Sequence, residues 1–268
     1  MSEEQIYFNK QEALRYFRAR QGDEQAEAAV DAAYQKLKNE LQPRFTAKRF
    51  GCRVIEENGI SYVQLDNGTR FQGNALARYV GDARALYVFG ATLGSRVDTA
   101  LRRMAITSVA EAGAGQATAT ALIETYCDDC CRMLQKKLPE GQRLKWRFSP
   151  GYGDWPLEEQ RILFSVLDCA HTIGLTLTKS CMMAPVKSVT AVIAILNRKE
   201  PAAVNGVRNP DPPLNIKEDG KNLADSEGCG ETERVSLSEN KCLRCGKINC
   251  EFRRTVPAND ATDRSEFT

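Results

Sequence analysis

The sequence predicts a domain that mixes helices with strands, followed by a linker and a cysteine-rich tail. Two early segments, 9–20 and 23–41, carry apolar residues at helical spacing. A continuous apolar run at 85–91 and an apolar–polar alternation at 143–148 are instead typical of strands. From about residue 200 these patterns give way to prolines, glycines and charges, so the compact domain is expected to end there.

The first two helices are predicted from their boundaries as well as their periodicity. Asn9 can cap the first helix, with Glu12 three residues later, and Pro43 ends the second. Strands are expected over 46–55 and 61–71, since Asn-Gly turns follow the first and interrupt the second. A short helix is expected from Gly73-Asn74, before the buried strand at 85–91.

A long helical region is predicted from Ser95 to about Leu138, as two helices broken near Ala112–Gly115. Cys127, Cys130 and Cys131 in its second half are best explained as small apolar side chains packed in a core. The remaining predicted elements are a strand at 143–148, a helix at 156–170, and strands at 173–178 and 187–196.

Composition excludes several classes of function. A net charge of +2 gives no electrostatic argument for nucleic acid as a partner. There is no basic, apolar secretion signal and no run of about 18 apolar residues, so we expect a cytoplasmic protein without a membrane partner. His171 is the only histidine, which removes a multi-histidine metal site from consideration.

The segment from Arg147 to Pro156 joins the strand predicted at 143–148 to the helix that follows. Gly151 and Gly153 allow positive φ and let the backbone approach a ligand closely. Arg147 can form paired hydrogen bonds with a carboxylate, and Tyr152 can stack or donate through its hydroxyl. The plainer interpretation is that Arg147 is an exposed strand charge and Tyr152 a packing residue.

Two stretches carry a resemblance to a known family. Arg147-x-x-x-Gly151-Tyr152 resembles the Arg-x-x-x-Gly-Tyr signature of the activation domain of cobalamin-dependent methionine synthase. Residues 177–189 are similar to that family's Thr-Glu-Ser-x-x-Met-x-Pro-x-x-Ser-Val run, in the same order. The resemblance covers roughly residues 9–196 and implies an α+β fold, with a twisted, mainly antiparallel sheet flanked by helices, over residues 1–199.

The resemblance also implies a ligand, S-adenosylmethionine. Arg147, Pro150, Gly151 and Tyr152 are the residues it assigns to that ligand, and Glu124 is the candidate partner for the ligand's amine. An ordinary solvated helix charge is the alternative for Glu124. No side chain is assigned a catalytic role, because the cofactors carry the chemistry.

The implied function is that of a free-standing activation subunit, which supports reductive remethylation of cobalamin held by a separate methionine synthase or another corrinoid protein. A one-electron donor such as flavodoxin or ferredoxin is then required. The alternative is a metal-binding or electron-carrying adaptor for a corrinoid methyltransferase, without methyl-donor binding. The sequence shows no counterpart of the family's N-terminal acidic ligand or Tyr-Tyr pair, which favours the adaptor, whereas the intact stretch from Arg147 to Tyr152 opposes it.

The tail after the 200–228 linker carries its own candidate site. Cys229, Cys242, Cys245 and Cys250 have a spacing that suits four-thiolate coordination of zinc or an iron–sulfur cluster. Thiols without metal are the third possibility. The predicted tail spans 229–268, and its polar end is expected to be disordered.

Overall fold

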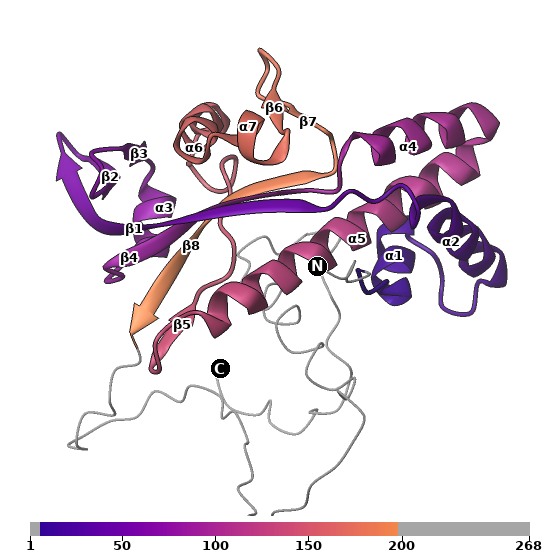
Figure 1. Cartoon of the computed structure of the whole chain (residues 1–268), viewed down its shortest axis with the longest axis horizontal. Helices are drawn as coiled ribbons and strands as arrows, with labels where there is room; N and C mark the ends of the chain where they lie inside the picture. The colour runs from indigo at the N-terminus through magenta and orange to yellow at the C-terminus, as the bar shows by residue number, and fades with distance from the viewer. Residues whose placement is uncertain (1–5, 198–268) are drawn as a thin grey trace, which may run out of the picture. The chain divides into compact units, whose positions relative to one another are not determined.

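The computed structural model describes residues 6–197, which form one six-stranded antiparallel sheet and its helices (Figure 1). The strand order is β3-β2-β1-β4-β8-β5, and every neighbouring pair is antiparallel. The strands are β1 (Arg44–Glu57), β2 (Ile60–Leu65), β3 (Arg70–Gln72), β4 (Ala85–Thr92), β5 (Gln142–Leu144) and β8 (Ser188–Asn197). The predicted α+β class and antiparallel sheet are confirmed.

Seven α-helices and one 3-10 turn accompany the strands within residues 6–197, and two of the helices precede β1. The helices and the turn are α1 (Lys10–Phe17), α2 (Glu24–Leu37), α3 (Asn74–Val80), α4 (Ser95–Thr107), α5 (Val109–Lys136), η1 (Leu157–Glu159), α6 (Gln160–Leu167) and α7 (Cys169–Ile173). A separate hairpin pairs β6 (Thr176–Leu177) with β7 (Met183–Ala184). No helix in this part of the chain is long and apolar enough to cross a membrane.

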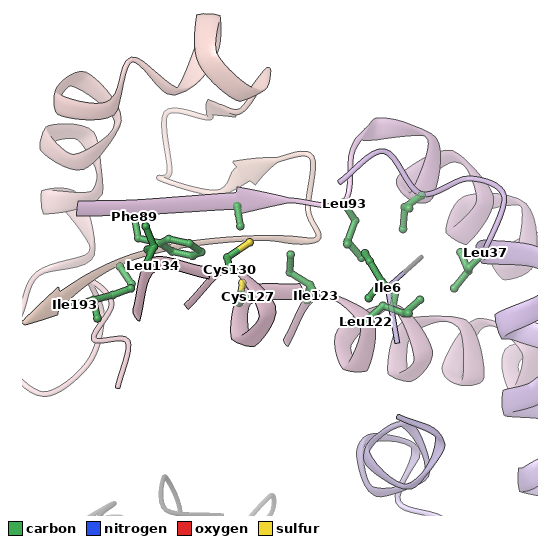
Figure 2. Close-up of a cluster of buried hydrophobic side chains, with 14 of the residues drawn as sticks. Ile6, Leu37, Phe89, Leu93, Leu122, Ile123, Cys127, Cys130, Leu134 and Ile193 are labelled. Atoms are coloured by element: carbon green, nitrogen blue, oxygen red, sulfur yellow. The ribbon is translucent and has the colours of Figure 1, made fainter. Parts of the chain in front are cut away.

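The neighbouring strands β4 and β8 are buried on both faces, and their side chains alternate between two cores. The core on one face joins the sheet to the long helix α5, and Figure 2 shows it between Phe89 of β4 and Cys127, Cys130 and Leu134 of α5. The other core contains Leu86 of β4, together with side chains of α3, α6 and α7. Cys127 and Cys130 are fully buried, as the core-packing interpretation predicts.

The break in the long helical region lies at Ser108, and its predicted place near Ala112–Gly115 was wrong. Ser108 has extended backbone, and its Oγ accepts a hydrogen bond from the Glu111 N–H at 3.1 Å, which caps α5. The glycines inside α5 serve packing instead. A Cβ at Gly115 would lie 2.5 Å from the sulfur of Met104 on α4.

Two further predicted elements differ from the structure, one being shorter than expected and the other divided. The strand predicted at 143–148 ends at Leu144, and Phe148 then makes a single bridge to Val192 of β8. The helix predicted at 156–170 is divided into η1, α6 and α7, with Asp168 at φ 53° between the last two. The segment after Leu144 is therefore held to the sheet by contacts other than a continuous ladder.

Candidate functional site

The glycine-containing turn is closed by hydrogen bonds within itself. The N–H of Gly151 donates to the carbonyl of Trp155 at 2.8 Å, and the N–H of Trp155 donates to the carbonyl of Tyr152 at 3.1 Å. Just before the turn, Phe148 exchanges backbone hydrogen bonds with Val192 of β8 at 2.8 and 3.0 Å. The turn thus starts from the sheet and leads directly into η1.

The two glycines of the turn have different surroundings. Gly151 has φ +89°, and a Cβ built there would meet only a methyl of Leu157, at 3.7 Å. Gly153 has φ +60°, and a Cβ there would lie 2.6 Å from the Cβ of Ala75 on α3. Gly153 is therefore required by close packing, whereas Gly151 leaves its backbone open to a ligand.

Tyr152 lies on the open side of the turn. Its side chain is 59% exposed, although its ring stays within 6.0 Å of the Phe148 ring. Pro150, on the other side, is buried. Tyr152 is not the packing residue of the plainer interpretation, and an exposed phenol ring beside an open glycine backbone is suited to contact with a bound molecule.

Arg147, just before this turn in the chain, is not the exposed strand charge of the plainer interpretation. Its side chain is only 6% exposed. Nη2 lies 2.7 Å from Oε2 of Glu124, and Nη1 lies 2.6 Å from Oδ1 of Asp128. Glu124 and Asp128 are one turn apart on α5, and their side chains are 34% and 22% exposed. One guanidinium therefore holds two carboxylates at the edge of the site.

Thiols of α5 complete the surroundings of this guanidinium. The Sγ of Cys131 lies 3.6 Å from Nη1 of Arg147. Burial opposes the charged form of Arg147, but its neighbours Cys127, Glu124 and Asp128 raise its pKa above the ordinary value. Burial also raises the pKa of Cys127 well above that of a free thiol, so Cys127 is neutral at ordinary pH. The two carboxylates are therefore what keeps the buried guanidinium charged.

Helix α1 brings one aromatic side chain to this region. Burial raises the pKa of the Tyr16 phenol, and the nearby Glu124 and Tyr152 raise it further. Arg15, beside it, places its guanidinium 4.3 Å from the centre of the Tyr16 ring. Helix α1 thus places Tyr16 near Glu124 and Tyr152.

The second motif meets the same face of α5. Lys187, in the segment between β7 and β8, donates through Nζ to Thr120 Oγ1 at 2.9 Å and to the Gln116 carbonyl at 3.3 Å. Gln116, Thr120 and Glu124 follow one another at four-residue spacing, so they line one face of the helix. Arg147 and Lys187, one from each motif, therefore contact neighbouring turns of this face.

The structure brings together four of the residues that the sequence assigns to the ligand, Arg147, Gly151, Tyr152 and Glu124. Pro150 lies in the same turn. Asp128 and Lys187 were not predicted as members of this region. The four-residue spacing from Glu124 to Asp128 could have indicated Asp128, since such residues share a helix face. Lys187 has no such local signal, because its partners are far away in the chain.

The proposed metal ligands Cys229, Cys242, Cys245 and Cys250 lie outside the described residues. Among residues 6–197, no group of three or more histidine, cysteine, aspartate or glutamate side chains is arranged to hold a metal ion.

Fold and site together describe an α+β domain with an arginine-led glycine turn between a sheet and a helix. Comparison with known proteins finds a family whose model matches part of the chain. Residues 126–205 match the family described as vitamin B12 dependent methionine synthase, activation domain. This match includes the turn, Arg147 and the second motif. The chain resembles that activation domain, as its two motifs predict.

The solved structures agree at the level of the fold. A chain described as "Crystal Structure of the MetH Reactivation Domain bound to AdoHcy" superposes with a TM-score of 0.50 and 18% sequence identity. The match covers 67% of this chain and 68% of that chain. No curated protein matches the sequence.

Proposed function

We propose that this chain binds S-adenosylmethionine at the turn from Arg147 to Tyr152 and acts in the activation of cobalamin-dependent methionine synthase. The observation that carries the proposal is that buried Arg147 and the open glycine turn lie within the segment that matches the activation family, and that Arg147 pairs with Glu124 of α5, just before that segment. The similar solved chain is described as bound to AdoHcy, the demethylated product of this ligand, which supports the choice.

Each residue has a distinct part in this proposal. The open backbone at Gly151 receives the ligand, and the exposed ring of Tyr152 packs on it or donates a hydrogen bond. Pro150 restricts the backbone just before the glycine. Arg147, whose two arms contact Glu124 and Asp128, positions Glu124, whose partly exposed carboxylate is the partner for the ligand's amine.

The chemistry of the reaction belongs to the bound molecules. S-adenosylmethionine supplies the methyl group, and a one-electron donor such as flavodoxin or ferredoxin supplies the electron that cobalt(II) needs before it can accept the methyl group. A separate methionine synthase, or another corrinoid protein, holds the cobalamin. The turn and its surrounding charges position the methyl donor for that partner.

Calorimetry with S-adenosylmethionine tests the proposal directly. Tyr152→Ala is the sharpest variant, because this side chain is mostly exposed and its loss leaves the fold intact. We expect wild type to bind, and Tyr152→Ala and Arg147→Ala to bind at least about tenfold more weakly. Arg143→Ala, an exposed arginine four residues earlier, is the matched control and should bind like wild type.

Two outcomes would reject this function. One is a wild-type protein that does not bind S-adenosylmethionine, which would favour the adaptor without a methyl-donor site. The other is equal affinity for wild type and Tyr152→Ala. Copurification with a corrinoid protein tests the partner separately.

The proposal for the tail is a four-thiolate metal site formed by Cys229, Cys242, Cys245 and Cys250. Anaerobic purification of the full chain, followed by metal analysis and an absorption spectrum, distinguishes the candidates. Iron with a visible charge-transfer band supports an electron-carrying cluster, and a colourless zinc protein supports a structural site. Metal content that is unchanged in Cys242→Ser/Cys245→Ser contradicts both.

A further inference from the structure

The signature turn rests on a short helix that is far from it in sequence. Asp154, directly after Gly153, accepts hydrogen bonds from the backbone N–H groups of Ala75 at 2.6 Å and Asn74 at 3.2 Å. These N–H groups are the unsatisfied donors of the first turn of α3. The hydrogen bonds lower the pKa of Asp154, which keeps the acceptor ionised at neutral pH. The turn therefore caps α3, and α3 fixes the end of the turn.

The other end of α3 fixes the segment that carries Arg147. The hydroxyl of Tyr79 donates to the carbonyl of Trp146 and accepts from the N–H of Ala194 on β8 at 3.0 Å. The carbonyl of Tyr79 accepts from Lys145 Nζ. The Tyr79 hydroxyl thus stands between the two strands where the predicted ladder is interrupted, and it sets the backbone position of the residue before Arg147.

Aromatic rings fill the space between these two anchors. The Tyr79 ring stacks on Phe148 at 4.8 Å, and Phe148 stacks on buried Trp155 at 5.9 Å. Trp155 meets Phe71 edge to face at 5.8 Å. Residues on both sides of Gly151 and Tyr152 are therefore held by α3 and the residues next to it.

We propose that α3 sets the shape of the ligand-binding turn, and that Asp154 and Tyr79 are its positioning residues. The inference rests on the proposed function. The turn has mostly internal hydrogen bonds, so without α3 its backbone would have to be ordered when the ligand binds. Preorganisation removes that cost and raises affinity without any contact between the positioning residues and the ligand. The binding motif then extends from Arg147 through Gly153 and Asp154 to Trp155.

The test separates positioning from ordinary stability. Binding of S-adenosylmethionine to the full chain is measured by calorimetry, well below the unfolding temperature, for Asp154→Ala, Asp154→Asn and Tyr79→Phe. We expect Asp154→Ala and Tyr79→Phe to bind roughly three- to tenfold more weakly, the effect of ordering one or two groups. Asp154→Asn keeps an acceptor oxygen and should recover part of the loss.

Leu101→Ala is the control for a general loss of stability. Leu101 is buried on α4, in the other core. This variant should lower the melting temperature at least as much as Asp154→Ala and leave ligand affinity unchanged.

The positioning role is overturned if Asp154→Ala and Tyr79→Phe bind like wild type, or if Leu101→Ala weakens binding equally. Either result leaves the proposed function standing when wild type and Tyr152→Ala still differ. A wild-type protein that does not bind the ligand overturns both the proposed function and this inference.

Discussion

Nη2 of Arg147 lies 2.7 Å from Oε2 of Glu124, and this contact joins the signature segment to the middle of α5. Asp128, one turn further along the helix, holds the other arm of the same guanidinium at 2.6 Å. Without the cation, two carboxylates would face each other on adjacent turns of α5. The contact therefore has a structural role that is separable from ligand binding.

Arg147→Met should destabilise the domain by about 1–3 kcal/mol. The expected loss is smaller than the roughly 3–5 kcal/mol that breaking a buried ion pair costs, because both carboxylates are partly exposed and regain some hydration. Urea unfolding measures the change. A triple variant that also carries Glu124→Gln and Asp128→Asn should recover much of the loss, since the unpaired charges are gone. A triple variant as unstable as Arg147→Met would show that packing, not charge, holds this contact.

Gly153→Ala should destabilise the domain by more than Gly141→Ala. Both glycines have positive φ, so both changes carry the backbone cost of about 1 kcal/mol. Only Gly153 also meets a neighbour, since its new Cβ would lie 2.6 Å from that of Ala75, whereas nothing lies within 4 Å at Gly141. We expect an additional loss of about 1–3 kcal/mol at Gly153 from overpacking. Equal losses in thermal or urea unfolding would contradict the close contact with α3.

Local patterns in the sequence predicted most of the fold because most elements are determined locally. Asn9 caps α1 as expected, with its Oδ1 accepting from the Glu12 N–H, and the apolar run at 85–91 became the central strand β4. The misplaced helix break has a physical cause. Glycine at 113 and 115 is tolerated inside α5 because neighbouring helices press closely against it, and such a contact is tertiary.

The site was predictable in part for the same reason. Arg147, Gly151 and Tyr152 lie within six residues and have a recognisable spacing. Asp128 pairs with Arg147, 19 residues later, and Tyr79 donates to the carbonyl of Trp146, 67 residues later. The four-residue spacing places Asp128 on the helix face of Glu124, but no local pattern indicates its contact with Arg147 or the contact of Tyr79 with Trp146, because both contacts depend on how α3 and α5 pack against the sheet.

Lys187 should contribute to the free energy of unfolding a part that increases as the pH rises in the alkaline range. Burial lowers the pKa of its ammonium group, although nearby Asp98 opposes this change. Between the lowered folded pKa and the ordinary value of 10.5, the unfolded chain binds more protons, so stability rises with pH. Lys187→Met should lack this contribution. Its urea midpoint at pH 10, relative to its midpoint at pH 8, should therefore be lower than the same comparison gives for wild type. If wild type and Lys187→Met have the same pH dependence, burial does not destabilise the charge of the Lys187 ammonium group.

Cys169 should instead lower the free energy of unfolding as the pH rises in the alkaline range. Burial raises the pKa of this thiol to about 12, with Asp168 contributing, whereas an unfolded cysteine has its ordinary pKa of 9.0. Above pH 9 the unfolded chain therefore loses a proton that the folded domain retains. Each such group lowers the free energy of unfolding by at most about 1.4 kcal/mol per pH unit, and the loss continues until the pH reaches the folded pKa.

Cys169→Ala should remove this contribution, so its free energy of unfolding should fall less steeply than that of wild type between pH 9 and pH 10.5. Ile173→Val is the matched control, since Ile173 is buried in the same core but does not ionise. It should cost about 0.5–1.5 kcal/mol at every pH and keep the wild-type slope. Because Lys187 contributes equally to all three proteins, its opposite effect cancels in the comparison. If the free energy of unfolding falls with pH at the same slope in Cys169→Ala, Ile173→Val and wild type, burial does not hold the Cys169 thiol in its neutral form.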